Sequence, residues 1–265
     1  MVIHLAIFGK VSLSMLNHGG TGTMFIPKNP VNCVLISGDC PTIILEFFKK
    51  RGIRSVQTPP LTCLPPFERY HADMQVFPLS QTELLVEPTV YEYYQNAFLD
   101  TNIKIKKGTA IGGNYPHSIA YNVARIGQTA FARKAYAEPQ LLRELESRGV
   151  TVTDVRQGYA KCSAAIVNDH ALITADRSIE AAAKHAGLDV LCIQPGGIAL
   201  PGCEYGFIGG ACGLLSPDEM LFTGDVTKHP DYNKIKDFLS EHNKRCVAIS
   251  GVALTDVGSV IPLRL

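Results

Sequence analysis

A block of strand, turn, strand, helix and strand recurs along this chain at a nearly constant spacing. In residues 159–197 a turn joins two apolar strands, and an alanine-rich helix capped by a glycine leads into a third strand. Equivalent blocks begin near Met74, Ile119, Ser163 and Ile208, so that successive starts lie 45, 44 and 45 residues apart. A period this steady indicates a repeat architecture, in which neighbouring units complete one another's core.

The two ends of the chain supply a fifth block. Residues 257–263 resemble a first strand with nothing after it, whereas residues 34–37, 42–50 and 54–57 resemble the strand, helix and strand that would follow. We therefore predict an α/β fold of five pseudo-symmetric strand-strand-helix-strand units, an α/β propeller whose first unit is closed by the C-terminal strand. Such closure leaves no unpaired sheet edge. The alternative is a doubly wound α/β domain in which the spacing is a coincidence.

Length and charge limit the organisation and the partners. A closed ring of five units uses the chain as one domain over residues 24–265, and we expect residues 1–23 to be a loose N-terminal extension or the product of an upstream start. The net charge is +1 with scattered basic residues, which gives no reason to expect nucleic acid as a partner. No apolar run is long enough to span a membrane, so we expect no membrane partner either.

The cysteines and glycines carry no familiar cofactor motif. The eight cysteines include no CxxC pair, and several stand in apolar strands, as expected for reduced core residues of a cytoplasmic protein. The glycine pairs form neither a GxGxxG nor a phosphate-binding loop, so we predict no nucleotide cofactor. Hence no cofactor and no metal are predicted, and the oligomeric state stays open.

The pair His71 and Asp73 is the first candidate for chemistry. On an extended segment, residues two apart point the same way, so the imidazole and the carboxylate would face one cavity. A carboxylate beside an imidazole suits acid/base catalysis. An isolated H-x-D is also common as a strand-end pair without a catalytic role. A metal site formed by this pair, His117 and a cysteine is chemically possible, but the sequence shows no tight ligand spacing for it.

Polar residues also mark the start of the other units. Asn122 interrupts an apolar strand, Lys161 precedes a strand, and Asp256 and Ser259 mark the start of the closing strand. If the first strands line the axis of the ring, these side chains converge on one central site. The alternative is that small and polar residues are simply what fits around a narrow axis.

Two cysteines compete as a nucleophile. Cys162 lies 91 residues after His71, which is two periods, and it follows Lys161, although neighbours on a strand face opposite sides. Cys212 lies in the glycine-rich run GGACG, where a substrate could approach the backbone closely. For either cysteine, an inert buried thiol is the alternative.

Five such units with an early H-x-D motif and a later cysteine resemble the pentein superfamily over most of residues 31–265. That superfamily contains arginine deiminases, dimethylarginine dimethylaminohydrolases, amidinotransferases and a non-catalytic translation initiation factor that keeps ribosomal subunits apart. The phrase CSAAIVNDHALITAD looks like the repeated strand-turn-strand phrase of this factor. More narrowly, ISGDCP, HADMQVFPL, KCSAAIV, YGFIGGACG and DVGSVIPL are similar to segments of an uncharacterised pentein-like family of anaerobic Gram-positive bacteria.

The resemblance implies a chemistry for the central site. In the guanidine-modifying members, a cysteine thiolate attacks the guanidinium carbon, a histidine of the H-x-D motif protonates the leaving amine, and carboxylates hold the guanidinium nitrogens. His71 and Asp73 match that motif, and Cys162 matches the nucleophile by its spacing. The run before Cys212 resembles the glycine-rich run before the family's cysteine, so Cys212 is the alternative nucleophile. The family's cysteine normally stands in the last repeat, unlike Cys162.

The resulting hypothesis is a thiol-dependent hydrolase or transferase that acts on a small guanidino or amidino substrate. We expect Asn122, Lys161, Asp39 and Asp256 to contribute to substrate binding. The alternative is a non-catalytic binding protein of the same fold, for a translation component or a small metabolite. An enzyme requires a cysteine sulfur within a few ångströms of the His71 imidazole, and a binding protein does not.

Overall fold

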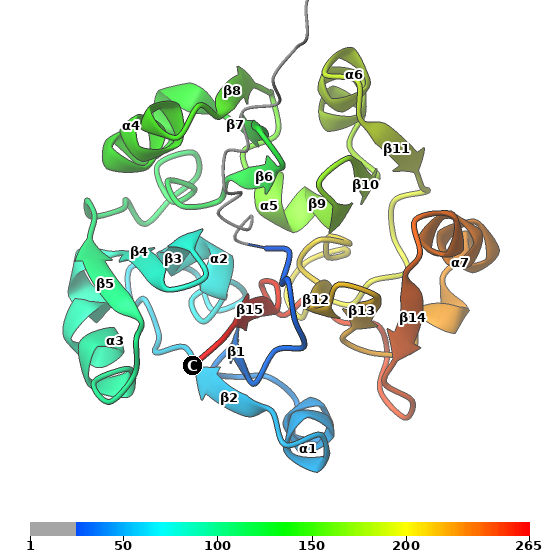
Figure 1. Ribbon diagram of the computed structural model, residues 1–265, viewed down its shortest axis with the longest axis horizontal. Helices are drawn as coiled ribbons and strands as arrows, with labels where there is room; N and C mark the ends of the chain where they lie inside the picture. The colour runs from blue at the N-terminus through cyan, green and yellow to red at the C-terminus, as the bar shows by residue number, and fades with distance from the viewer. Residues whose placement is uncertain (1–24) are drawn as a thin grey trace, which may run out of the picture.

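The computed structural model describes residues 25–265, and the predicted extension at residues 1–23 lies outside this range. The described chain forms five three-stranded sheets around a common centre (Figure 1). The first sheet contains β1 (Cys33–Ile36), β2 (Arg54–Gln57) and β15 (Ile261–Leu263), and the second contains β3 (Val76–Ser80), β4 (Glu83–Val86) and β5 (Lys104–Lys107). The third contains β6 (Ala124–Ile126), β7 (Thr129–Ala132) and β8 (Thr151–Asp154), and the fourth contains β9 (Ala164–Asn168), β10 (Ala171–Thr174) and β11 (Asp189–Cys192). The fifth contains β12 (Cys212–Ser216), β13 (Glu219–Phe222) and β14 (Arg245–Ala248).

All five sheets have the same pairing. The middle strand runs antiparallel to the strand at the centre of the molecule and parallel to the outer strand, as β10 does with Ile166 of β9 and Val190 of β11 opposite its Leu172. In the first sheet β1 is the middle strand, and the C-terminal β15 pairs antiparallel with it, with Leu35 opposite Ile261. The expected completion of the first unit by the C-terminal strand is therefore confirmed.

One helix per sheet connects the middle strand to the outer strand and covers the outside of the ring (Figure 1). These helices are α1 (Thr42–Lys50), α3 (Tyr91–Ala97), α4 (Pro139–Ser147), α6 (Arg177–His185) and α7 (Tyr232–Glu241). Residues 25–265 also contain three 3₁₀ turns, η1 (Pro88–Val90), η2 (Lys134–Tyr136) and η3 (Val226–Lys228). Each helix places fully buried side chains against its sheet, namely Ile44 and Phe48, Tyr94, Leu141 and Leu145, Ile179 and Ala183, and Ile235 and Leu239. None of the helices in residues 25–265 has the length and apolarity required to cross a membrane.

The local sequence explains why these helices begin and end where they do. In α6, the Asp176 carboxylate accepts hydrogen bonds from the N–H groups of Ser178 at 2.8 Å and Ile179 at 2.9 Å, which satisfies donors that the first turn leaves free. After the helix, Gly187 adopts a φ of +76°, a conformation that costs glycine little.

Ion pairs join neighbouring sheets at equivalent positions. Arg51, the residue that follows α1, donates two hydrogen bonds to Glu219 of β13, at 2.8 and 2.9 Å. Arg148, the residue that follows α4, donates to Glu83 of β4 at 2.9 Å. In both cases the end of a helix is fixed to the middle strand of the preceding sheet.

The starts of the strands differ from the prediction. Met74 and Ser163, expected in strands, lie instead in the short helical turns α2 (Ala72–Gln75) and α5 (Ala160–Ser163), and β6 and β12 begin several residues after Ile119 and Ile208. The reason is that polar groups near the centre replace the strand ladder as partners of the backbone. The Asn122 side chain, for example, accepts hydrogen bonds from two backbone N–H groups of α5.

Candidate functional site

The short helix α2 places His71 and Asp73 side by side near the centre of the ring. His71 precedes the helix and Asp73 lies in its first turn, and both side chains are buried. The Asp73 N–H donates to the carbonyl of Gly258 at 3.2 Å. A Cβ on Gly258 would lie 2.2 Å from the Cβ of His71, so the glycine allows this close approach. The two residues therefore meet through a helical turn and not through the extended segment that we expected.

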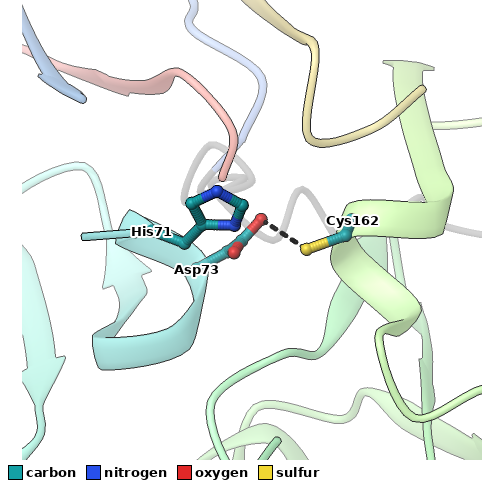
Figure 2. Close-up of side chains that lie close together, drawn as sticks. All are labelled: His71, Asp73 and Cys162. Carbon is teal, nitrogen blue, oxygen red and sulfur yellow. Dashed lines mark hydrogen bonds between the residues drawn. The ribbon is translucent and has the colours of Figure 1, made fainter. Parts of the chain in front are cut away.

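Helix α5 brings Cys162 to the same place (Figure 2). Its thiol donates to Asp73 Oδ2 at 3.1 Å, and Asn122 Nδ2 donates to the sulfur, also at 3.1 Å. The Asn122 Oδ1 accepts from the N–H groups of Lys161 at 2.7 Å and Cys162 at 3.2 Å. Asn122 thus positions the thiol through both ends of its amide.

The Lys161 side chain faces the same carboxylate as the neighbouring thiol. Its amine donates to Ser259 Oγ at 2.9 Å and to the Gly209 carbonyl at 3.1 Å, and Ser259 donates to Asp73 Oδ2. The expectation that the side chains of Lys161 and Cys162 face opposite sides of a strand is wrong, because these residues lie in a helical turn and are 4% and 2% exposed. The amine is a buried counter-charge for Asp73, acting through the hydroxyl of Ser259.

Two further carboxylates surround His71. Asp256 accepts hydrogen bonds from the N–H groups of Phe207 and Gly258, and burial raises its pKa. Burial also raises the pKa of Glu68, which accepts a hydrogen bond from Tyr159. Both carboxylates interact electrostatically with His71 and with Asp73.

Sequence reasoning missed Glu68, whereas Ser259 was among the polar residues expected near the centre. Glu68 stands in a proline-rich segment that resembles a linker, and Ser259 adopts a φ of +74°, which is rare outside glycine. No motif at Glu68 could have revealed it.

The electrostatic environment keeps the Cys162 thiol protonated. Burial raises its pKa well above the usual value, and the negative charges of Asp73 and Asp256 raise it further, whereas the hydrogen bond from Asn122 opposes the rise. Without another positive charge nearby, this thiol is a poor nucleophile.

Cys212, the alternative nucleophile, is not part of the group formed by His71, Asp73 and Cys162. Burial raises the pKa of its thiol to about 12, although the charge of Lys161 opposes this, and its sulfur contacts the Gly209 carbonyl at 3.8 Å. Other parts of the protein already fill the space beside the preceding glycines, because a Cβ on Gly210 would lie 2.0 Å from an Asp256 carboxylate oxygen. The glycine-rich run therefore allows close packing inside the protein.

A cavity of about 240 Å³ reaches the cluster from outside. His71 and Asp256 line its buried part, and the exposed Asp39 lines its outer part. Asn122, Lys161 and Cys162 do not line this cavity, so of the four predicted binding residues only Asp39 and Asp256 contact it.

The same cluster has the composition of a metal site. One ligand atom each from His71, Asp73 and Cys162 lie within 4.8 Å of one another, and the described residues contain one such group. His117, which we considered as a further ligand, packs against Tyr136 at a ring-centroid distance of 5.3 Å and is not part of the group.

Solved structures of guanidine-modifying enzymes share this fold. DDAH from Pseudomonas aeruginosa, a cysteine-to-serine mutant complexed with citrulline, matches with a TM-score of 0.53 and 9% identity over 83% of this chain and 92% of its own. The inosamine-phosphate amidinotransferase of Streptomyces griseus matches with a TM-score of 0.55 and 10% identity, over 92% and 96%. An amidinotransferase of saxitoxin biosynthesis from Microseira wollei matches with a TM-score of 0.55 and 9% identity, over 87% and 91%.

These neighbours are penteins, so the resemblance in fold is confirmed. At 9–10% identity, the likeness concerns the fold alone. The comparison with curated proteins found no match. The match to the model of a family of unknown function (DUF6873) extends over residues 35–261, and the chain therefore belongs to that family.

Proposed function

We propose that the protein is a thiol-dependent hydrolase or transferase that acts on a small guanidino or amidino compound. Cys162 is the nucleophile, His71 the general acid/base and Asp73 the carboxylate that holds the substrate cation. The observation that carries this proposal is the buried cluster itself, in which ligand atoms of thiol, imidazole and carboxylate lie within 4.8 Å of one another.

The charges around the cluster favour a cationic substrate. Glu68, Asp73 and Asp256 are buried, and within the described chain the Oδ1 atom of Asp73 has no hydrogen-bond partner. Leaving a buried acceptor unsatisfied costs about 1–3 kcal/mol, more if it is charged. A guanidinium group offers positive charge and a planar set of N–H donors, which matches a carboxylate.

The proposed reaction transfers an amidino carbon to sulfur. The thiol proton of Cys162 passes to the His71 imidazole, and Sγ forms a bond to the guanidinium carbon. As the carbon–nitrogen bond breaks, His71 gives the proton to the leaving amine, and an S-amidino intermediate remains. Attack by water makes the protein a hydrolase, and attack by an acceptor amine makes it a transferase; either step releases the Cys162 thiol.

Substrate binding would also counteract the raised pKa of the Cys162 thiol. The negative charge of Asp73 raises the pKa of Cys162, and a bound cation offsets that charge. The substrate therefore lowers the pKa of the thiol that attacks it. Without substrate, the thiol stays protonated and unreactive.

The structural neighbours support this chemistry. They include two amidinotransferases and a cysteine-to-serine mutant complexed with citrulline, so this fold accommodates amidino and ureido groups. The rival function is binding without chemistry. It is favoured by one observation, the raised pKa of the buried Cys162 thiol, which leaves the free protein without an activated nucleophile.

The test is to incubate the protein with a panel of guanidino compounds in the presence of EDTA, which keeps metal ions off the cluster. We expect release of ammonia or amine. The intact mass should increase by an amidino group on Cys162 when the amine leaves, or by the substituted amidino group when ammonia leaves. Cys162→Ala should abolish both signals, and the matched control Cys212→Ala should retain them. Turnover that survives Cys162→Ala would contradict the proposal, and tight binding with neither turnover nor adduct would support the rival.

A further inference from the structure

The cavity that leads to the cluster has a buried end and an exposed end. His71 and Asp256 line the buried end, and Asp39 is exposed at the other. Apolar side chains, including Phe67 and Leu200, line the cavity as well. A ligand with its guanidinium group at the cluster would therefore place an alkyl chain against the apolar wall and its other end near Asp39.

The charges along the cavity sum to a negative value. Among the described residues that line the cavity, Asp39 and Asp256 carry carboxylates and none is lysine or arginine. Helix α1 begins beside the cavity after Pro41, and its N-terminus contributes about half a positive charge. The full negative charge of Asp39, two residues before Pro41, exceeds it. The buried amine of Lys161 donates to Ser259 and Gly209 and does not line the cavity.

We propose that the substrate is a guanidino or amidino compound whose other end is an amine and not a carboxylate. This inference rests on the function proposed above and adds the class of the tail. An ammonium group at the outer end is attracted by Asp39, whereas a carboxylate there meets a like charge and no cationic side chain among the described lining residues. The enzyme thus selects guanidino amines over guanidino acids.

Three ligands with one head group and different tails test the inference. Butylguanidine has a neutral tail, agmatine (4-aminobutylguanidine) a cationic tail and 4-guanidinobutanoate an anionic tail. Calorimetric titration should show agmatine binding about three- to fivefold more tightly than butylguanidine, and 4-guanidinobutanoate more weakly by a similar factor, as expected for one partly exposed charge pair. Both differences should shrink at high salt.

Asp39→Asn identifies the residue responsible. In this variant, agmatine and butylguanidine should bind within about twofold of each other, because the charge that separates them is gone. The matched control is Asp237→Asn, which removes one exposed carboxylate from α7 and should preserve the preference for agmatine.

The outcomes separate this inference from the proposed function. If 4-guanidinobutanoate binds as tightly as agmatine, or if Asp39→Asn retains the preference, the tail assignment is wrong, while guanidine binding at the cluster stands. If none of the three ligands binds, both the tail assignment and the guanidine-modifying function are overturned.

Discussion

Replacing Asp73 by asparagine should make the Cys162 thiol more reactive and at the same time abolish guanidine binding. Asp73 Oδ2 lies 3.1 Å from the sulfur, and after burial its charge is the largest cause of the raised thiol pKa. Asparagine retains an oxygen that can accept from Ser259 but carries no charge. The pKa of Cys162 should therefore fall in Asp73→Asn, and the thiolate should form at a lower pH.

The distance sets the size of the effect. Two unit charges about 4 Å apart interact by about 4 kcal/mol at an effective dielectric constant of about 20. Lys161 already offsets part of the Asp73 charge through Ser259. If about a third of this interaction energy acts between Asp73 and the thiolate of Cys162, removing it changes the acid dissociation constant of the thiol about tenfold. We therefore expect alkylation of Cys162 near neutral pH to be about tenfold faster in Asp73→Asn.

The assay is iodoacetamide alkylation as a function of pH, with the modified residue located by mass spectrometry. Cys162 is 2% exposed, so the absolute rate also depends on access, whereas the midpoint of the rate–pH curve reports the thiol pKa. The midpoint should move to lower pH in Asp73→Asn and stay in place in the control Asp237→Asn. The affinity for agmatine should fall in Asp73→Asn and stay the same in Asp237→Asn. An unchanged midpoint in a folded Asp73→Asn protein would refute the assignment of Asp73 as the charge that suppresses the thiol.

Three further predictions concern stability, each measured by chemical denaturation. Gly258→Ala should lower the free energy of unfolding by about 2–4 kcal/mol, because the new Cβ would lie 2.2 Å from the Cβ of His71 and the residue has a φ of +65°. The control Gly187→Ala, at a φ of +76° with no neighbour within 4 Å, should lower it by only about 1 kcal/mol. Equal losses in the two variants would contradict a steric clash at Gly258. Glu219→Ala should cost about 1–3 kcal/mol, less at high salt, because it removes a bidentate arginine partner between two sheets. Burial raises the pKa of Asp256, so this residue stabilises the fold fully below the usual aspartate pKa, and the contribution is lost as the pH rises through its pKa in the folded protein. Asp256→Asn should remove that part of the pH dependence of the free energy of unfolding. An unchanged dependence of this free energy on pH would contradict the assignment.

The sequence allowed the repeat and its closure to be predicted because both depend on local patterns. Apolar strands, glycine caps and the 45-residue spacing together indicated the five sheets, and residues 257–263 indicated the strand that completes the first. The position where each central strand begins could not be predicted in this way. At these positions, buried side chains such as Asn122 bind backbone groups of another unit, and such long-range contacts leave no periodic signal.

The candidate site shows the same division. His71, Asp73 and Cys162 were found from a motif and from the repeat spacing, and the structure brings them together. The local backbone conformation was predicted wrongly, because an extended chain was assumed where α2 and α5 are helical. Glu68 was missed, since only the folded chain brings it to the cluster.

The raised pKa of Cys162 changes how a thiol-labelling experiment should be interpreted. Slow alkylation of the free protein would ordinarily indicate a structural cysteine. Here the carboxylates that would bind a guanidinium group are the same groups that keep the thiol protonated, so a slow reaction in the free state is what the proposed enzyme requires. A protonated thiol also resists oxidation, because the thiolate is the species that is oxidised. Reactivity in this site is therefore tied to occupancy by a cation, and a test of Cys162 as the nucleophile has to compare the free protein with the protein bound to a guanidino compound.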